Sequence, residues 1–169
     1  MEILDLILGI VQDGLFAALA AIGFAAISNP PRIALKWCGV IAAAGHITRY
    51  CLVNYTPVGI VPASMVGALA VGLLAIIIAK RVKCPPETFS FPALLPMIPG
   101  IYAYRTVQAF VLALTAHTEQ EFQHFFYLSE SNCLTCVFVI LCMVIGQMLP
   151  IIAFKRVAYT VTRPDEKER

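Results

Sequence analysis

Charged residues are scarce in this chain of 169 residues: Asp, Glu, Lys and Arg make up 13% of it, whereas a soluble domain typically carries about 25%. Long polar segments are missing as well, and the longest one inside the chain, His117–Asn132, is expected to be a loop or a surface helix. Hydrophobic residues instead make up 60%, and the mean hydropathy is +0.83. This composition leaves nothing that forms a separate soluble domain and predicts an integral membrane protein.

Residue patterns that support a chemical reaction are also missing. The three histidines have no metal-ligand spacing, and no pair of a nucleophile and a base is visible. Cys133 and Cys136 form a C-x-x-C, but cysteines three apart on a membrane helix are more often plain small residues than a redox pair. The sequence therefore predicts no enzyme, no metal site and no cofactor.

Five apolar stretches approach or exceed the roughly 20 residues that cross a bilayer. They are residues 3–28, 33–54, 62–79, 89–116 and 133–154. We predict an all-α integral membrane protein, a bundle of five transmembrane helices in a single domain over residues 1–156, with a cytoplasmic tail over residues 157–169. The first stretch does not fit a cleaved signal peptide, because its start is acidic and Asp13 interrupts it.

The distribution of basic residues predicts an orientation. Ten of the twelve Lys and Arg residues follow the first, third and fifth stretches. The opposite side has acidic residues and no Lys or Arg outside a span. By the positive-inside rule the amino terminus lies outside and the carboxyl terminus in the cytoplasm. The net charge of +2 is then a signal of topology, and no nucleic-acid partner is predicted.

The fourth stretch is interrupted by Pro92, Pro96, Pro99 and Gly100. Each proline removes a backbone donor, and irregular backbone at membrane depth is tolerated where it is buried in protein or lines a wet cavity. Broken spans of this kind build substrate sites in transporters. We predict a half-helix, Ile101–Ala116, whose amino end lies within the bilayer and favours an anion. The alternative is a simple proline kink.

Two kinds of side chain follow this break. Arg105 lies one turn after it and adds a positive charge, and Tyr102 and Tyr104 are expected to line the opening. We expect a small carboxylate to enter from the cytoplasm, dock at the half-helix, pass toward Arg49 and leave outside. The membrane potential drives a dianion outward, whereas a zwitterionic amino acid requires proton antiport.

Three polar side chains inside apolar stretches are candidates for this path. Asp13 lies near the middle of the first stretch, where an ionised carboxylate costs roughly 3 kcal/mol. His46 and Arg49 share a face of the second. We expect Arg49 to hold a carboxylate through two hydrogen bonds, and Asp13 and His46 to transfer protons. The alternatives are a neutral Asp13 that links helices, a hydrogen-bonded structural His46, and an Arg49 that reaches the outer headgroups.

A row of mostly small residues predicts close helix packing in the first stretch. It consists of Gly9, Asp13, Ala17, Ala21 and Ala25, each four residues apart. In lipid, such a row lets two helix backbones approach closely. We interpret the glycine and the alanines as a packing seam within the bundle.

Four blocks of residues carry a family resemblance. They are Gln12-Asp13, Ala34-Leu35-Lys36-Trp37-Cys38, Gly45-His46-x-x-Arg49 and Pro96-Met97-Ile98-Pro99-Gly100-x-x-Ala103-Tyr104. In this order and spacing they resemble the small subunit of the split threonine/serine exporter family, the YjjB type of ThrE-like membrane proteins. The likeness extends from the start of the chain to the end of the fifth stretch, and Arg105 lies just after the last block.

The resemblance implies a bacterial inner-membrane protein that works with a larger, separately encoded membrane subunit. It also implies export of a small metabolite, either threonine and serine or a dicarboxylate such as succinate. Since five spans are few for alternating access, a partner subunit or a homo-oligomer is expected. The alternative function is a non-transporting scaffold that stabilises a partner transporter.

Overall fold

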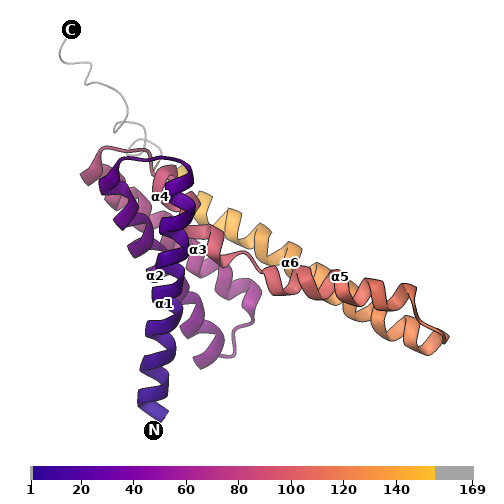
Figure 1. Cartoon of the computed structure of the whole chain (residues 1–169). Coiled ribbons are helices and arrows are strands. Elements are labelled where there is room, and N and C mark those ends of the chain that lie inside the picture. Colours follow the sequence, from indigo (N-terminus) through magenta and orange to yellow (C-terminus); the bar gives the residue numbers. More distant parts are fainter. Residues whose placement is uncertain (1, 155–169) are drawn as a thin grey trace. The chain divides into compact units, whose positions relative to one another are not determined.

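The computed structural model describes residues 2–154, and these residues form helices joined by short turns (Figure 1). The elements are α1 (Glu2–Ile27), α2 (Arg32–Tyr55), α3 (Ile60–Val82), α4 (Glu87–Leu94), the 3₁₀ turn η1 (Leu95–Met97), α5 (Gly100–Leu114) and α6 (Glu119–Ala153). No strand occurs within residues 2–154, so the all-α prediction is confirmed for this part of the chain. The predicted tail, 157–169, lies outside the described residues.

The described residues form two compact units. The first unit contains residues 2–97 and 142–154, and the second contains residues 98–141. In the second unit α5 pairs with the beginning of α6, where the Ser129 hydroxyl donates a hydrogen bond of 3.0 Å to the Thr106 carbonyl. The division of residues 1–156 into one transmembrane domain stays a prediction.

Three helices, α1, α3 and α6, are long and apolar enough to cross a membrane. A fourth candidate results if α4, η1 and α5 are counted as one broken span. The bounds of α2 agree with the second predicted stretch, but this helix carries His46, Arg49 and Asn54 and is not among the candidates. The bundle of five spans with a broken fourth span is therefore not confirmed.

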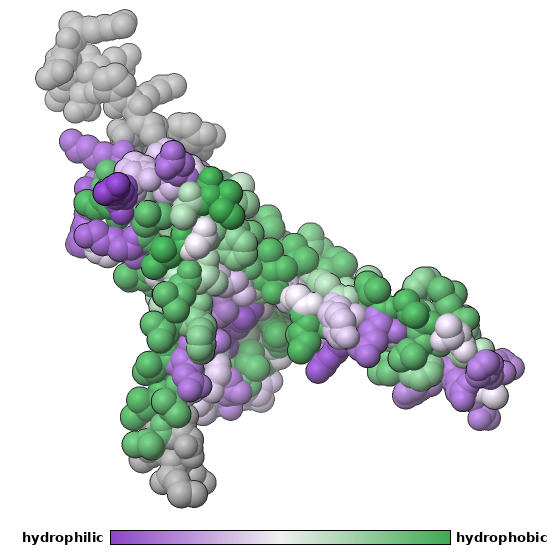
Figure 2. Space-filling view, viewed as in Figure 1, coloured by the Kyte–Doolittle hydropathy of each residue, from purple (hydrophilic) through white to green (hydrophobic). Residues whose placement is uncertain are grey.

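The outward face of α1 is apolar, as expected for a helix in contact with lipid (Figure 2). Its large exposed hydrophobic side chains are Leu4, Ile7, Leu8, Val11, Leu15, Phe16, Leu19, Phe24 and Ile27. On the other side Ala17, Ala21 and Ala25 are buried in the first unit, where α1 packs on α2 and α4. The predicted packing seam is thus confirmed for these alanines.

Pro92 does not interrupt the backbone, contrary to the prediction. It lies inside α4, and the helix ends only at Leu94. A proline at position 92 leaves the carbonyl of Thr88 without its helical donor. The Cys38 thiol of α2 lies 3.5 Å from that carbonyl oxygen and donates to it. The lost backbone hydrogen bond is therefore replaced by a side chain, and the helix continues.

The interruption lies between Leu94 and Gly100. Pro96 is part of the 3₁₀ turn, and Pro99 directly precedes α5. The helix that follows, Gly100–Leu114, has nearly the bounds predicted for the half-helix. These two prolines therefore stand where the regular backbone stops and begins again.

The structure corrects the prediction for His117–Asn132. These residues are not a separate loop or surface helix, because from Glu119 onward they belong to one helix of 35 residues that ends at Ala153. At about 1.5 Å per residue α6 is roughly 52 Å long. No Gly or Pro occurs between Glu119 and Ile145, so nothing in this segment favours a break.

The start of α6 is capped by its own side chains. The Thr118 hydroxyl accepts a hydrogen bond of 3.2 Å from the Glu121 backbone N–H, and the Glu121 carboxylate accepts one of 3.1 Å from the His117 N–H. This arrangement is close to a capping box, which marks a helix start at the Thr118-x-x-Glu121 pattern. The polar segment therefore begins the long helix.

Candidate functional site

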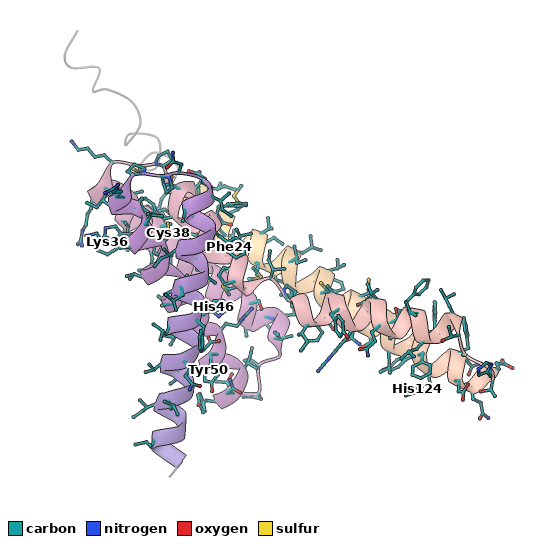
Figure 3. The ribbon with its side chains drawn as sticks, viewed as in Figure 1. Phe24, Lys36, Cys38, His46, Tyr50 and His124 are labelled. Atoms are coloured by element: carbon teal, nitrogen blue, oxygen red, sulfur yellow. The ribbon has the colours of Figure 1, made fainter. Side chains whose placement is uncertain are left out.

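Asp13 of α1 and His46 of α2 form a polar pair inside the first unit. His46 is labelled on α2 in Figure 3. The distance between His46 Nδ1 and Asp13 Oδ2 is 3.3 Å. The His46 side chain is 8% exposed and the Asp13 side chain 30% exposed, so the imidazole is buried while the carboxylate keeps access to its surroundings. Two residues that lie 33 positions apart in the sequence thus form one hydrogen-bonded pair.

The second nitrogen of His46 is unsatisfied. Nε2 is buried and has no hydrogen-bonding partner among the described residues. Buried polar atoms in proteins nearly always have a partner, so this nitrogen is an exception that calls for an explanation. If Nδ1 carries the proton and donates to Asp13, Nε2 is left with a free lone pair.

Arg49 lies one turn after His46 on α2 and is half-buried. Its Nη1 donates a hydrogen bond of 2.7 Å to the backbone carbonyl of Met97. A guanidinium has five N–H donors, and the other four have no partner in residues 2–154. Arg49 therefore points toward the interruption of the helix and retains free donors for a carboxylate.

Of the predicted site residues, the structure brings four into the first unit: Asp13, His46, Arg49 and Pro96. The other four lie in the second unit: Pro99, Gly100, Tyr104 and Arg105. Tyr104 is 66% exposed and Arg105 is exposed as well. A shared binding site for the two groups stays a prediction.

The first turn of α5 offers fewer free donors than the sequence suggested. The N–H of Gly100 donates to the Ile98 carbonyl at 2.8 Å, and the N–H of Tyr102 donates to the Pro99 carbonyl at 3.0 Å. These two backbone N–H groups would otherwise be available to bind an anion at the start of the helix. Gly100 has no positive φ, and a Cβ at this position would meet no atom within 4 Å. Arg49 is therefore the stronger anion-binding candidate.

A polar contact between α4 and α6 in the first unit involves two residues outside the predicted site. Gln147 Nε2 donates a hydrogen bond of 2.7 Å to the hydroxyl of Ser90, which is fully buried. Each of the two residues is a polar side chain in an apolar stretch, and this signal was present in the sequence. A buried pair of this kind fixes the position of the two helices relative to each other.

The cysteines form no disulfide bond in the described structure. Cys133 and Cys136 are free thiols, like the other four cysteines. Within residues 2–154, no group of three His, Cys, Asp or Glu side chains is placed to hold a metal ion.

The sequence matches the family described as "Threonine/Serine exporter, ThrE" over residues 13–153. An uncharacterized protein of Haemophilus influenzae is 35% identical over 104 residues, which are 62% of this chain and 35% of that protein. The matched part thus spans about a third of the relative's length. No solved structure matches this chain. Since the family match covers most of the chain, and since the helices are apolar enough for a membrane, this protein belongs to the threonine/serine exporter (ThrE) family of membrane transport proteins.

Proposed function

We propose that this chain is the membrane subunit of a two-component exporter of small carboxylates or amino acids. The substrate is threonine or serine, or a dicarboxylate of the succinate type. The family supports export, and the resemblance to split exporters supports a larger membrane subunit as the second component. The two subunits act together in the bacterial inner membrane. The amino terminus lies outside and the carboxyl terminus in the cytoplasm.

The observation that carries the proposal is the guanidinium of Arg49. An arginine in an apolar helix is costly in a membrane and is by default a sign of function. One of its donors is bonded to the Met97 carbonyl, and the others are free to form the two parallel hydrogen bonds that bind a carboxylate. Both proposed substrate classes have a carboxylate, so this residue recognises the group they share.

The pair formed by Asp13 and His46 provides the proton step. A zwitterionic amino acid has no net charge, so the membrane potential does not drive its export. A proton that enters on Asp13 or His46 as the substrate leaves provides the driving force. A dianion needs no such step, because each exported negative charge gains about 2.3 kcal/mol per 100 mV. The proton pair therefore favours the amino acid.

The residues after the interruption form the entrance in this proposal. Pro96 and Pro99 keep the backbone open, Gly100 begins α5, and Tyr104 and Arg105 guide the carboxylate toward Arg49. The exposure of Tyr104 and Arg105 agrees with a surface that meets substrate or the partner subunit. A homo-oligomer is a further way to complete the pathway.

The test is efflux from vesicles that contain this chain and the larger subunit. The vesicles are loaded with labelled threonine or labelled succinate, and a pH gradient and a membrane potential are imposed separately. Export of threonine that follows the pH gradient supports the proton-coupled form, and export of succinate that follows the potential supports the dianion form. Efflux no faster than that of vesicles with the larger subunit alone contradicts the proposal.

A scaffold that stabilises the partner transporter is the second candidate function. The observation that favours it is the hydrogen bond from Arg49 to Met97, because it gives the arginine a structural use. The two functions differ in their need for the charge of Arg49. An Arg49→Gln chain that assembles normally but does not export excludes the scaffold.

A further inference from the structure

Met97 occupies an unusual position at the end of η1. Its side chain is fully buried, and its carbonyl accepts the hydrogen bond from Arg49. In a continuous helix this carbonyl would accept a hydrogen bond from the backbone N–H of residue 101. Because the helix stops here, the carbonyl is available to a side chain. A positively charged group at a helix carboxyl end is also favoured by the helix dipole.

The side chain of Met97 lies in a notch where α2 and α3 cross. The floor of the notch is made of Gly45 and Gly67, one from each helix. A Cβ on Gly67 would lie 2.9 Å from the Gly45 carbonyl oxygen and 2.9 Å from the Cε of Met97. A Cβ on Gly45 would lie 3.7 Å from the Met97 sulfur. Gly67 therefore leaves room for the methionine, whereas a Cβ on Gly45 would meet its sulfur at an ordinary contact distance.

Both the side chain and the carbonyl of Met97 lie close to Arg49. The Cβ of Arg49 is 3.3 Å from the place of a Cβ on Gly67, so the arginine stem borders the notch. The buried methionine side chain thus fixes the backbone of residue 97, and the carbonyl of residue 97 fixes one edge of the guanidinium. Loss of the side-chain anchor changes the place of the carbonyl even though every residue retains a carbonyl.

We propose that Met97 is a positioning residue, which orients the Arg49 guanidinium so that its free donors face a substrate carboxylate. The identity of the ligand, a substrate carboxylate, rests on the proposed function. The contact between Met97 and Arg49 is independent of that function. The interruption at Pro96 and Pro99 then has a specific use, which is to release one carbonyl that holds the arginine.

The first test measures the reactivity of Arg49 without any substrate. The purified protein is treated with phenylglyoxal, which modifies guanidinium groups, and the modified peptides are quantified by mass spectrometry. The exposed Arg105 of the second unit is the reference in the same sample. For Met97→Ala we expect Arg49 to react about tenfold faster relative to Arg105, within the range for loss of one hydrogen bond to a charged group. Met97→Leu, which conserves the volume, is expected to restore the slow reaction.

Met143→Ala is the matched control, because Met143 is a second buried methionine of the first unit, 4% exposed, on α6. It loses the same side-chain atoms, and Met143 is not among the atoms nearest to Gly45 or Gly67, so we expect no change at Arg49. Equal reaction rates for Arg49 in Met97→Ala and wild type overturn the inference. An equal increase in Met143→Ala does so as well, because it indicates general loosening.

The second test measures export by the complex with the larger subunit. We expect Met97→Ala to raise the apparent KM about tenfold with the maximal rate changed by less than about twofold, as for a lost binding interaction. A lower maximal rate at unchanged KM contradicts positioning. If the wild-type complex exports neither substrate, the proposed function fails, while the phenylglyoxal result still decides whether Met97 positions Arg49.

Discussion

The close approach of α2 and α3 predicts that Gly67→Ala destabilises the protein. The added Cβ would lie 2.9 Å from the Gly45 carbonyl oxygen, whereas ordinary contact begins at about 3.4 Å. The helices must therefore separate by about 0.5 Å, or the strain must be absorbed locally. The second close atom, the Cε of Met97, is the flexible end of a side chain but is fully buried. Overpacking of this kind typically costs about 1–3 kcal/mol.

The assay is unfolding in detergent micelles by increasing fractions of SDS, followed by circular dichroism. Replacing a helical glycine by alanine by itself stabilises by roughly 0.5–1 kcal/mol. Gly23→Ala is the control for this gain, because a Cβ on Gly23 in α1 meets no atom within 4 Å. Gly67→Ala should be less stable than Gly23→Ala by about 1–3 kcal/mol. Equal stability of the two variants refutes the packing described at this crossing.

Three further outcomes follow from the polar contacts and the interruption. Asp13→Asn retains the shape of the pair with His46 but removes the charge, so export should lose its dependence on an imposed pH gradient in the vesicle assay. Ser90→Ala leaves the Gln147 amide unpaired and should cost about 1–3 kcal/mol in SDS unfolding, and adding Gln147→Leu should recover part of this loss because it removes the unpaired amide. Replacing Pro96 and Pro99 together by alanine should abolish export, and intact export contradicts the role of the interruption.

The helices of the first unit were largely predictable from the sequence. Long apolar runs gave the bounds of α1, α2 and α3 to within three residues, because each run ends at polar or turn-forming residues. The row of alanines in α1 predicted its buried side, since helical spacing alone determines which residues share a face. The pairing of Asp13 with His46 required the packing of α1 on α2, which no spacing within one helix specifies.

Other features depend on tertiary contacts that a single sequence does not reveal. Pro92 is accommodated because Cys38 of a different helix donates to the freed carbonyl. Arg49 donates to a backbone atom of Met97, and backbone acceptors carry no signal of their own in the sequence. The error at His117–Asn132 had a different cause, because polarity was interpreted as a break although the Thr118-x-x-Glu121 pattern indicates a helix start.

The central claim is that the charge of Arg49 binds the exported carboxylate. The most direct measurement is export by the complex with Arg49→Gln, normalised to the amount of assembled complex. Glutamine retains an N–H donor for the Met97 carbonyl and removes the charge, so assembly should be preserved. We predict that export then falls at least about tenfold, within the range for a lost hydrogen bond to a charged group. Export by the assembled Arg49→Gln complex at the wild-type rate would contradict the claim.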